Sequence, residues 1–128
     1  MLKKQSGFTL IELIAVLVIL GILAATAVPK FINLSDEAQV AAAESIVGSI
    51  ESASALNHAV DIAVEAGLST DTFEVIDTCD DSDGLLAGGL PTGYSIADTT
   101  AVADKETQSC DLTAPGGTTY AFTVIGAQ

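Results

Sequence analysis

An almost unbroken apolar run occupies residues 8–28, where the only polar side chains belong to Thr9, Glu12 and Thr26. As an α-helix, these 21 residues would span ~31 Å, which is enough to cross a bilayer. Lys3 and Lys4 precede the run, so the positive-inside tendency places the N-terminus in the cytoplasm and the rest of the chain outside. Glu12 needs an explanation, because a carboxylate in the hydrocarbon layer costs roughly 2.5–3.5 kcal/mol on insertion scales.

A second helical pattern follows Pro29, in which apolar and small residues recur at intervals of three and four. This stripe consists of Phe31, Leu34, Ala38, Ala42, Ile46, Ser49, Ala53, Leu56, Val60 and Ala63. Gly67 is the expected end, because glycine adopts the left-handed cap conformation without a steric penalty. We therefore expect a helix over residues 8–66, membrane-spanning over 8–28 and amphipathic over 29–66.

Two residues weaken this helix in its interior, Gly21 and Pro29. In a helix, glycine costs about 1 kcal/mol and proline about 3 kcal/mol relative to alanine. Pro29 also lacks the N–H that would bind the carbonyl of Ala25. A kink is the simplest expectation for an isolated chain.

After Gly67 the pattern changes to a polar connection with a possible short strand at residues 73–76, followed by segments that alternate apolar and polar residues. The expected strands are "GYSIA" from Gly93, "TQSCDLT" from Thr107 and "TTYAFTVIG" from Thr118, with a turn at "APGGT". They predict an antiparallel meander packed on the helix stripe. Residues 67–128 would therefore form the sheet of an α+β head.

Cys79 and Cys110 follow no metal-ligand spacing, and a disulfide is the simplest interpretation of the pair. Such a bond requires an oxidising compartment, which agrees with a head outside the cytoplasm. It would stabilise the fold by roughly 3–4 kcal/mol in the chain-entropy model. Two free, buried thiols are the alternative.

The charge is strongly negative, with four lysines against seventeen acids and a net charge of −13. Because such a surface repels phosphate backbones, the head alone is not expected to bind nucleic acid. Cations or basic partners suit it better.

The acidic run "DTCDDSDG", residues 77–84, could suggest calcium, but it does not fit an EF-hand. Aligned on Asp81 and Asp83, the pattern puts Cys79 at the first ligand position and Leu90 at the last. A solvated acidic loop is favoured over an irregular calcium site. His58, the only histidine, is expected to be a packed or surface residue. We expect no cofactor and no enzymatic activity.

The leader and the start of the apolar run, "GFTLIE" from Gly7 to Glu12, resemble the processing site of type IV pilins and pseudopilins. A secretory signal or a plain membrane anchor would leave Glu12 unexplained. The resemblance implies a pilin fold, with residues 1–7 removed by a prepilin peptidase after Gly7 and the new amine of Phe8 methylated. The stretch "PKFINLSDEAQ" is similar to the mannose-sensitive haemagglutinin subgroup of pilins.

The resemblance also implies a partner for Glu12, namely the terminal amine of Phe8 in a neighbouring subunit. Snorkelling of the Glu12 carboxylate to the inner interface is the alternative. In related assembled pili the chain between positions like Gly21 and Pro29 becomes extended, and the same is expected here.

The function expected from this resemblance is that of a major pilin, which forms a helical homopolymer for adhesion, surface attachment or motility. The subunit would span the inner membrane once, meet the pilus assembly machinery there, and become extracellular in the pilus. The alternatives are a pseudopilin of a type II secretion system and a minor, tip-located adhesin pilin. The N-terminal motif does not separate them.

Overall fold

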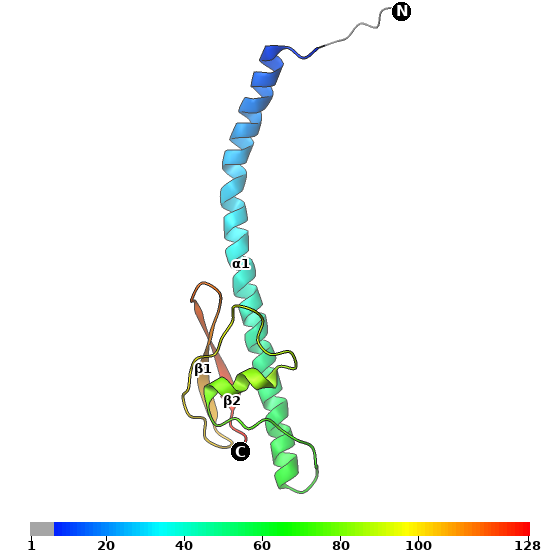
Figure 1. The fold of residues 1–128 in the computed structure, drawn as a ribbon, viewed down its shortest axis with the longest axis vertical. Coiled ribbons are helices and arrows are strands. Elements are labelled where there is room, and N and C mark those ends of the chain that lie inside the picture. The colour runs from blue at the N-terminus through cyan, green and yellow to red at the C-terminus, as the bar shows by residue number, and fades with distance from the viewer. Residues whose placement is uncertain (1–6) are drawn as a thin grey trace, which may run out of the picture. The chain divides into compact units, whose positions relative to one another are not determined.

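The computed structural model describes residues 7–128, and within its helix it describes the backbone but not the side chains of residues 28–33. The elements are helix α1 (Leu10–Glu65), the 3-10 helix η1 (Cys79–Leu85), strand β1 (Thr107–Thr113) and strand β2 (Thr119–Ile125) (Figure 1). The chain divides into two compact units, Met1–Val40 and Ala41–Gln128. The predicted α+β class, a long N-terminal helix with a small antiparallel sheet, is confirmed.

The first unit contains the apolar beginning of α1. The 18 residues Leu10–Ala27 have a mean hydropathy of 2.7 and are long and apolar enough to cross a membrane. None of their side chains is buried, and Leu10 and Ile11 are about three-quarters exposed. So large an apolar surface needs lipid or other protein chains around it.

In the second unit, the end of α1 forms the cap predicted at Gly67. Gly67 has a φ of 69°, and its N–H donates to Val64 O at 2.9 Å. The N–H of Leu68 donates to Ala63 O at 2.8 Å, so the two bonds form a Schellman motif. The left-handed glycine therefore satisfies the last carbonyls and turns the chain back along the helix.

Strands β1 and β2 pair in antiparallel register, with Cys110 opposite Phe122. The predicted turn at residues 114–118 is confirmed, since Gly116 and Gly117 both have positive φ angles and Ala114 N donates to Thr118 O at 2.8 Å. Each strand buries alternate residues, so one face of the hairpin contributes to the core.

Two of the predicted strands are wrong. Of residues 73–76 only Ile76 makes a bridge, to Ala127, and of the segment from Gly93 only Ser95 does, to Thr113. The backbone of Glu74 bonds instead to a side chain of α1, which takes the place of a neighbouring strand. The sheet in the described chain therefore has two strands.

Helix η1 interrupts the segment that was predicted as an irregular connection. Its start is closed by a capping box in which the Asp81 carboxylate accepts from the Thr78 backbone N at 2.8 Å and from the Thr78 hydroxyl at 2.7 Å. Cys79 and Ser82 are its buried residues, so the short helix carries one half of the cysteine pair into the core.

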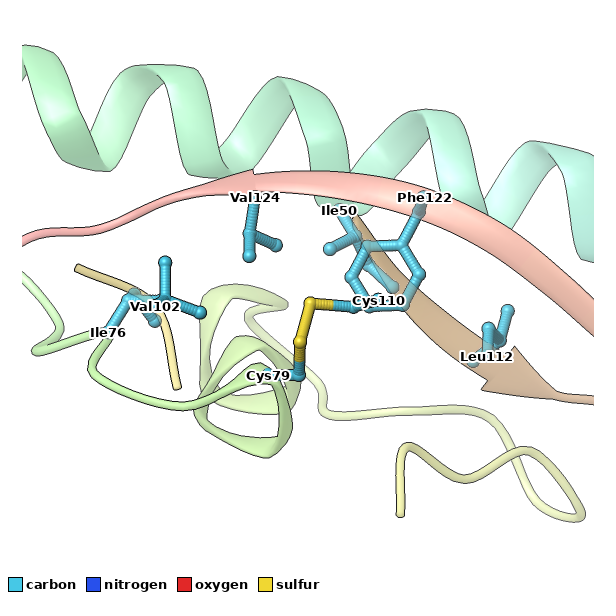
Figure 2. Close-up of a cluster of buried hydrophobic side chains, with 8 residues drawn as sticks. All are labelled: Ile50, Ile76, Cys79, Val102, Cys110, Leu112, Phe122 and Val124. Carbon is cyan, nitrogen blue, oxygen red and sulfur yellow. A yellow bond between two sulfur atoms is a disulfide. The ribbon is translucent and has the colours of Figure 1, made fainter. Parts of the chain in front are cut away.

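The core lies between α1, η1 and the hairpin, and Figure 2 shows its largest cluster. The buried members are Ile50, Ile76, Cys79, Val102, Cys110, Leu112, Phe122 and Val124. Cys79 and Cys110 form a disulfide within it, with their Cα atoms 5.7 Å apart. The predicted disulfide is therefore present and joins η1 to β1.

The buried stripe of α1 is rotated by about one residue from the predicted one. Ala42, Ser49 and Leu56 were assigned to it but are exposed, Leu56 to 71%, whereas Ile46 is half-buried. The residues actually buried in the second half of α1 are Ala43, Ile50, Ser54 and Asp61. An apolar pattern missed this face because two of its four members are polar.

Candidate assembly site

The first turn of α1 holds the Glu12 carboxylate in a defined position. Glu12 Oε2 accepts from the Thr9 backbone N and from the Thr9 hydroxyl, both at 2.8 Å, and Glu12 N donates to Thr9 Oγ1 at 3.3 Å. This is the reciprocal arrangement of a capping box, with Thr9 as the N-cap. Among the described residues nothing donates to Glu12 Oε1, so this oxygen can accept from a second group.

The predicted cleavage point lies immediately before this cap. Gly7, Phe8 and Thr9 are exposed and precede the helix, and the Phe8 side chain is 89% exposed. Residues 1–6, which include the two leader lysines, lie outside the described residues. A peptidase can reach the Gly7–Phe8 bond without unwinding α1.

The predicted weak points both fall within the bounds of α1, and the helix assignment runs through them. Open space surrounds Gly21, where an added Cβ would have no neighbour within 4 Å. The side chain of Pro29 is among those not described. Extension of residues 21–29 concerns an assembled fibre and stays a prediction.

Three polar residues on α1, not recognised from the sequence, fasten the helix to the rest of the second unit. Glu51 Oε1 accepts from Thr123 N and Ser54 Oγ accepts from Ile125 N, both at 2.9 Å. Asn57 donates to Glu74 O at 2.7 Å and accepts from Glu74 N at 2.8 Å. Their spacing of three residues is the signal that could have revealed a polar stripe facing the free edge of β2.

The acidic loop uses its carboxylates internally. Hydrogen bonds from the Thr78 hydroxyl and backbone hold the pKa of Asp81 below its usual value. The Asp81 carboxylate in turn raises the pKa of Asp77, which lies beside it. Within residues 7–128, leaving out the side chains of 28–33, the one group of three possible metal ligands is Cys79, Cys110 and Asp98. Disulfide sulfurs are not thiolate ligands, so this group does not form a metal site.

His58 is half-buried, and its Nδ1 lies 3.8 Å from Oδ2 of Asp61. Asp61 is fully buried, and neither of its oxygens has a hydrogen-bond partner among the described residues. The prediction that His58 is a packed residue is confirmed.

These features define a class of protein: a subunit with a membrane-capable N-terminal helix, a carboxylate held at the start of that helix, and a small disulfide-bonded α+β head. Residues 2–28 match the family model of the prokaryotic N-terminal methylation motif. Over 111 residues the chain is 34% identical to the type IV narrow pilus major component PilA5 of Thermus thermophilus, covering 87% of this chain and 83% of that protein.

Two matches to Pseudomonas aeruginosa proteins are shorter. Type II secretion system core protein G is 49% identical over 51 residues, which are 40% of this chain and 36% of that protein. A fimbrial protein is 46% identical over 52 residues, which are 41% of this chain and 34% of that protein. No solved structure matches this chain.

The chain belongs to the type IV pilin family. This follows from the methylation motif and from a relationship to a pilin that extends along most of both chains. Its relatives are structural proteins, so the chain is a structural protein and not an enzyme.

Proposed function

We propose that this chain is the major subunit of a type IV pilus, a helical homopolymer that serves adhesion, surface attachment or motility. One observation carries this proposal: the 34% identity to a protein named as a major pilus component extends over 87% of the chain, through the head as well as the helix. The identity to the secretion protein covers only 40% of the chain.

Maturation in this proposal begins with a prepilin peptidase that removes residues 1–7 and leaves Phe8 as a methylated terminus. Before assembly the subunit spans the inner membrane through residues 8–28, with its N-terminus in the cytoplasm. The assembly machinery then moves residues 8–28 into the filament core. Residues 29–66 and 67–128 form the outer helix half and the head. The methylation motif and the accessible Gly7–Phe8 bond support this sequence of events.

Glu12 pairs in the filament with the Phe8 amine of a neighbouring subunit. The free Oε1 lone pairs support this, because the Thr9 cap occupies Oε2 and leaves the other oxygen able to accept.

The test is to shear surface fibres from cells, image them by electron microscopy and measure the intact mass of their main component. We expect long fibres made of chains that lack residues 1–7 and carry one added methyl group. A main component with an intact leader, or one cut near Ala27, would contradict the proposed maturation.

A pseudopilin of a type II secretion system is the second candidate, favoured by the 49% identity over 51 residues to core protein G. Deletion of the gene separates the two. Loss of secreted proteins with surface fibres retained would favour the pseudopilin, and loss of fibres with secretion unchanged would favour the pilin. Fibres that persist but lose surface attachment would instead indicate a minor, tip-located adhesin.

A further inference from the structure

The charges of the mature chain leave few ways for one copy to attract another. Without residues 1–7, two lysines remain against seventeen acids, a side-chain balance of −15. Like charges brought together at an interface cost several kcal/mol. Each close contact between copies therefore needs one of very few cations, namely the Phe8 amine, Lys30 or Lys105.

Lys105 is already neutralised within its own subunit. Its Nζ lies 2.8 Å from Glu65 Oε1 and 3.0 Å from Asp104 Oδ2, and these two carboxylates raise the pKa of Lys105. Its backbone N also donates to Gly126 O at 3.1 Å. If the Phe8 amine pairs with Glu12, Lys30 is the remaining side-chain cation that can attract a second copy.

The second unit contains a groove that suits a lysine. It has a volume of about 340 Å³, and its walls are Ala53, Leu56, Asn57 and Val60 of α1 on one side and Glu74, Gly84 and Leu85 on the other. Most of these walls are apolar, which matches the four-carbon stem of a lysine.

The acidic end of the groove is Glu74. Its carboxylate Oε2 would lie 3.8 Å from a Cβ placed on Gly84, so the charge lies over the bare backbone of η1. The two hydrogen bonds from Asn57 fix the Glu74 backbone at 2.7 and 2.8 Å. Among the described side chains none donates to the Glu74 carboxylate. Glu74 is thus a rigidly held carboxylate that still lacks a cation.

We propose that Lys30 of one copy enters this groove on a neighbouring copy, with its stem against Leu56 and Val60 and its ammonium on Glu74. This inference rests on the proposed assembly into fibres and names a second charge pair for it. Apolar walls around the pair exclude water and strengthen the attraction.

The test is a charge exchange in the full-length chain. Lys30→Glu should lower the ratio of sheared fibre to membrane-held mature subunit by at least about fivefold, since a tenfold change corresponds to about 1.4 kcal/mol. Glu74→Lys added to it should restore the ratio. The matched control is Glu106→Lys, which makes the same charge change at an exposed position outside the groove and should not restore it.

A second measurement finds the contact directly. Lys30→Cys and Glu74→Cys chains expressed together should form mixed disulfide-linked dimers when intact fibres are oxidised. Because each chain carries one added cysteine, a mixed dimer joins two copies.

Several outcomes would overturn the proposal. One is a normal fibre ratio for Lys30→Glu, another is equal rescue by Glu106→Lys, and a third is oxidised fibres without mixed dimers. Less mature subunit in the membrane before assembly would show instead that Lys30 binds lipid headgroups. If the wild-type chain made no fibres at all, the proposed function itself would fail, which is a different result from a normal Lys30→Glu fibre.

Discussion

Glu12 has two chemical roles that the processing motif alone does not separate. The motif "GFTLIE" also contains the capping sequence T-x-x-E, and the structure shows Thr9 and Glu12 satisfying each other at the start of α1. A carboxylate used in this way starts a helix, whereas a carboxylate paired with the Phe8 amine joins two subunits. The two roles need different atoms and charges, so they can be tested apart.

Glu12→Gln should prevent fibre assembly while leaving the cap in place, because glutamine serves at this position of a capping box but carries no charge. Thr9→Ala should do the opposite, since it removes the cap, worth about 1 kcal/mol, and keeps the carboxylate. Glu12→Val should insert and lose its leader normally but fail to assemble. The measurement is again the ratio of sheared fibre to membrane-held mature subunit.

Leader removal, followed by intact mass, is the control for these three variants. A buried charge pair adds little net stability over an apolar isostere, so the expected loss is of register and assembly efficiency. Normal fibres from Glu12→Gln and none from Thr9→Ala would show that the cap is the important role. Normal fibres from Glu12→Val would favour interfacial snorkelling of Glu12.

Asp98 gives the head a pH-dependent contribution to stability. Hydrogen bonds from the Thr100 hydroxyl and backbone N lower the pKa of this carboxyl in the folded chain. The ionised form is therefore favoured by folding. Its stabilisation is complete above the unfolded pKa, about 3.9, and is lost as the pH falls through the folded pKa.

Asp98→Asn should accordingly unfold at a lower temperature than wild type at pH 7, with a smaller difference as the pH falls below about 4. Thermal unfolding of the full chain in detergent, followed from pH 7 to pH 2, measures this. Glu106→Gln changes one charge at an exposed site and serves as the control. A gap that widens on acidification would show that Asp98 does not act through its ionised form.

At the scale of elements, α1 substitutes for a third strand beside β2. β2 leaves the N–H groups of Thr123 and Ile125 unpaired by β1, and Glu51 and Ser54 accept from them. An unpaired strand edge invites pairing with another chain, and a helix that covers it prevents this. The polar positions on the buried stripe are therefore part of the sheet's hydrogen bonding.

Ser54→Ala should lower the free energy of unfolding by about 1–3 kcal/mol, because Ser54 is 1% exposed and its loss leaves the Ile125 N–H buried without an acceptor. The matched control is Ser49→Ala on the same helix. Ser49 is exposed, so the change should stay within about 0.5 kcal/mol. Urea unfolding of the detergent-solubilised chain with its disulfide intact compares them, and equal effects would contradict the role given to Ser54.

These pairings mark the limit of what sequence patterns predicted. Local signals sufficed for the capped helix end at Gly67, the turn at Gly116 and Gly117, and the two strands that flank it. They failed where a side chain distant in sequence satisfies the backbone, as Asn57 does for Glu74, since no local periodicity records such a contact. The cap at Thr9 was missed for another reason, because one short motif carries two functions.

At the scale of the whole molecule, repulsion is the main obstacle to association between filaments. Each mature subunit carries a side-chain balance of −15, because two lysines face seventeen acids. Many of the acids in the second unit are exposed, including Glu44, Glu106 and Asp111. A filament that displays these heads at every repeat is a strongly acidic rod, and its contact with another such rod depends on the ions between them.

Lateral association of sheared fibres should therefore rise with salt. The screening length falls from about 30 Å at 0.01 M to about 10 Å at 0.1 M, so repulsion between rods loses most of its reach over this interval. Magnesium or calcium chloride should act at lower ionic strength than sodium chloride, since a divalent ion can bridge carboxylates on two fibres. Glu106→Gln combined with Asp111→Asn should shift the onset to lower salt, whereas Ser49→Ala, which keeps the charge, should not. Light scattering of fibre suspensions measures the onset, with electron micrographs to distinguish bundles from breakage. Scattering that ignores both salt and the charge variants would show that surface charge does not control how these filaments associate.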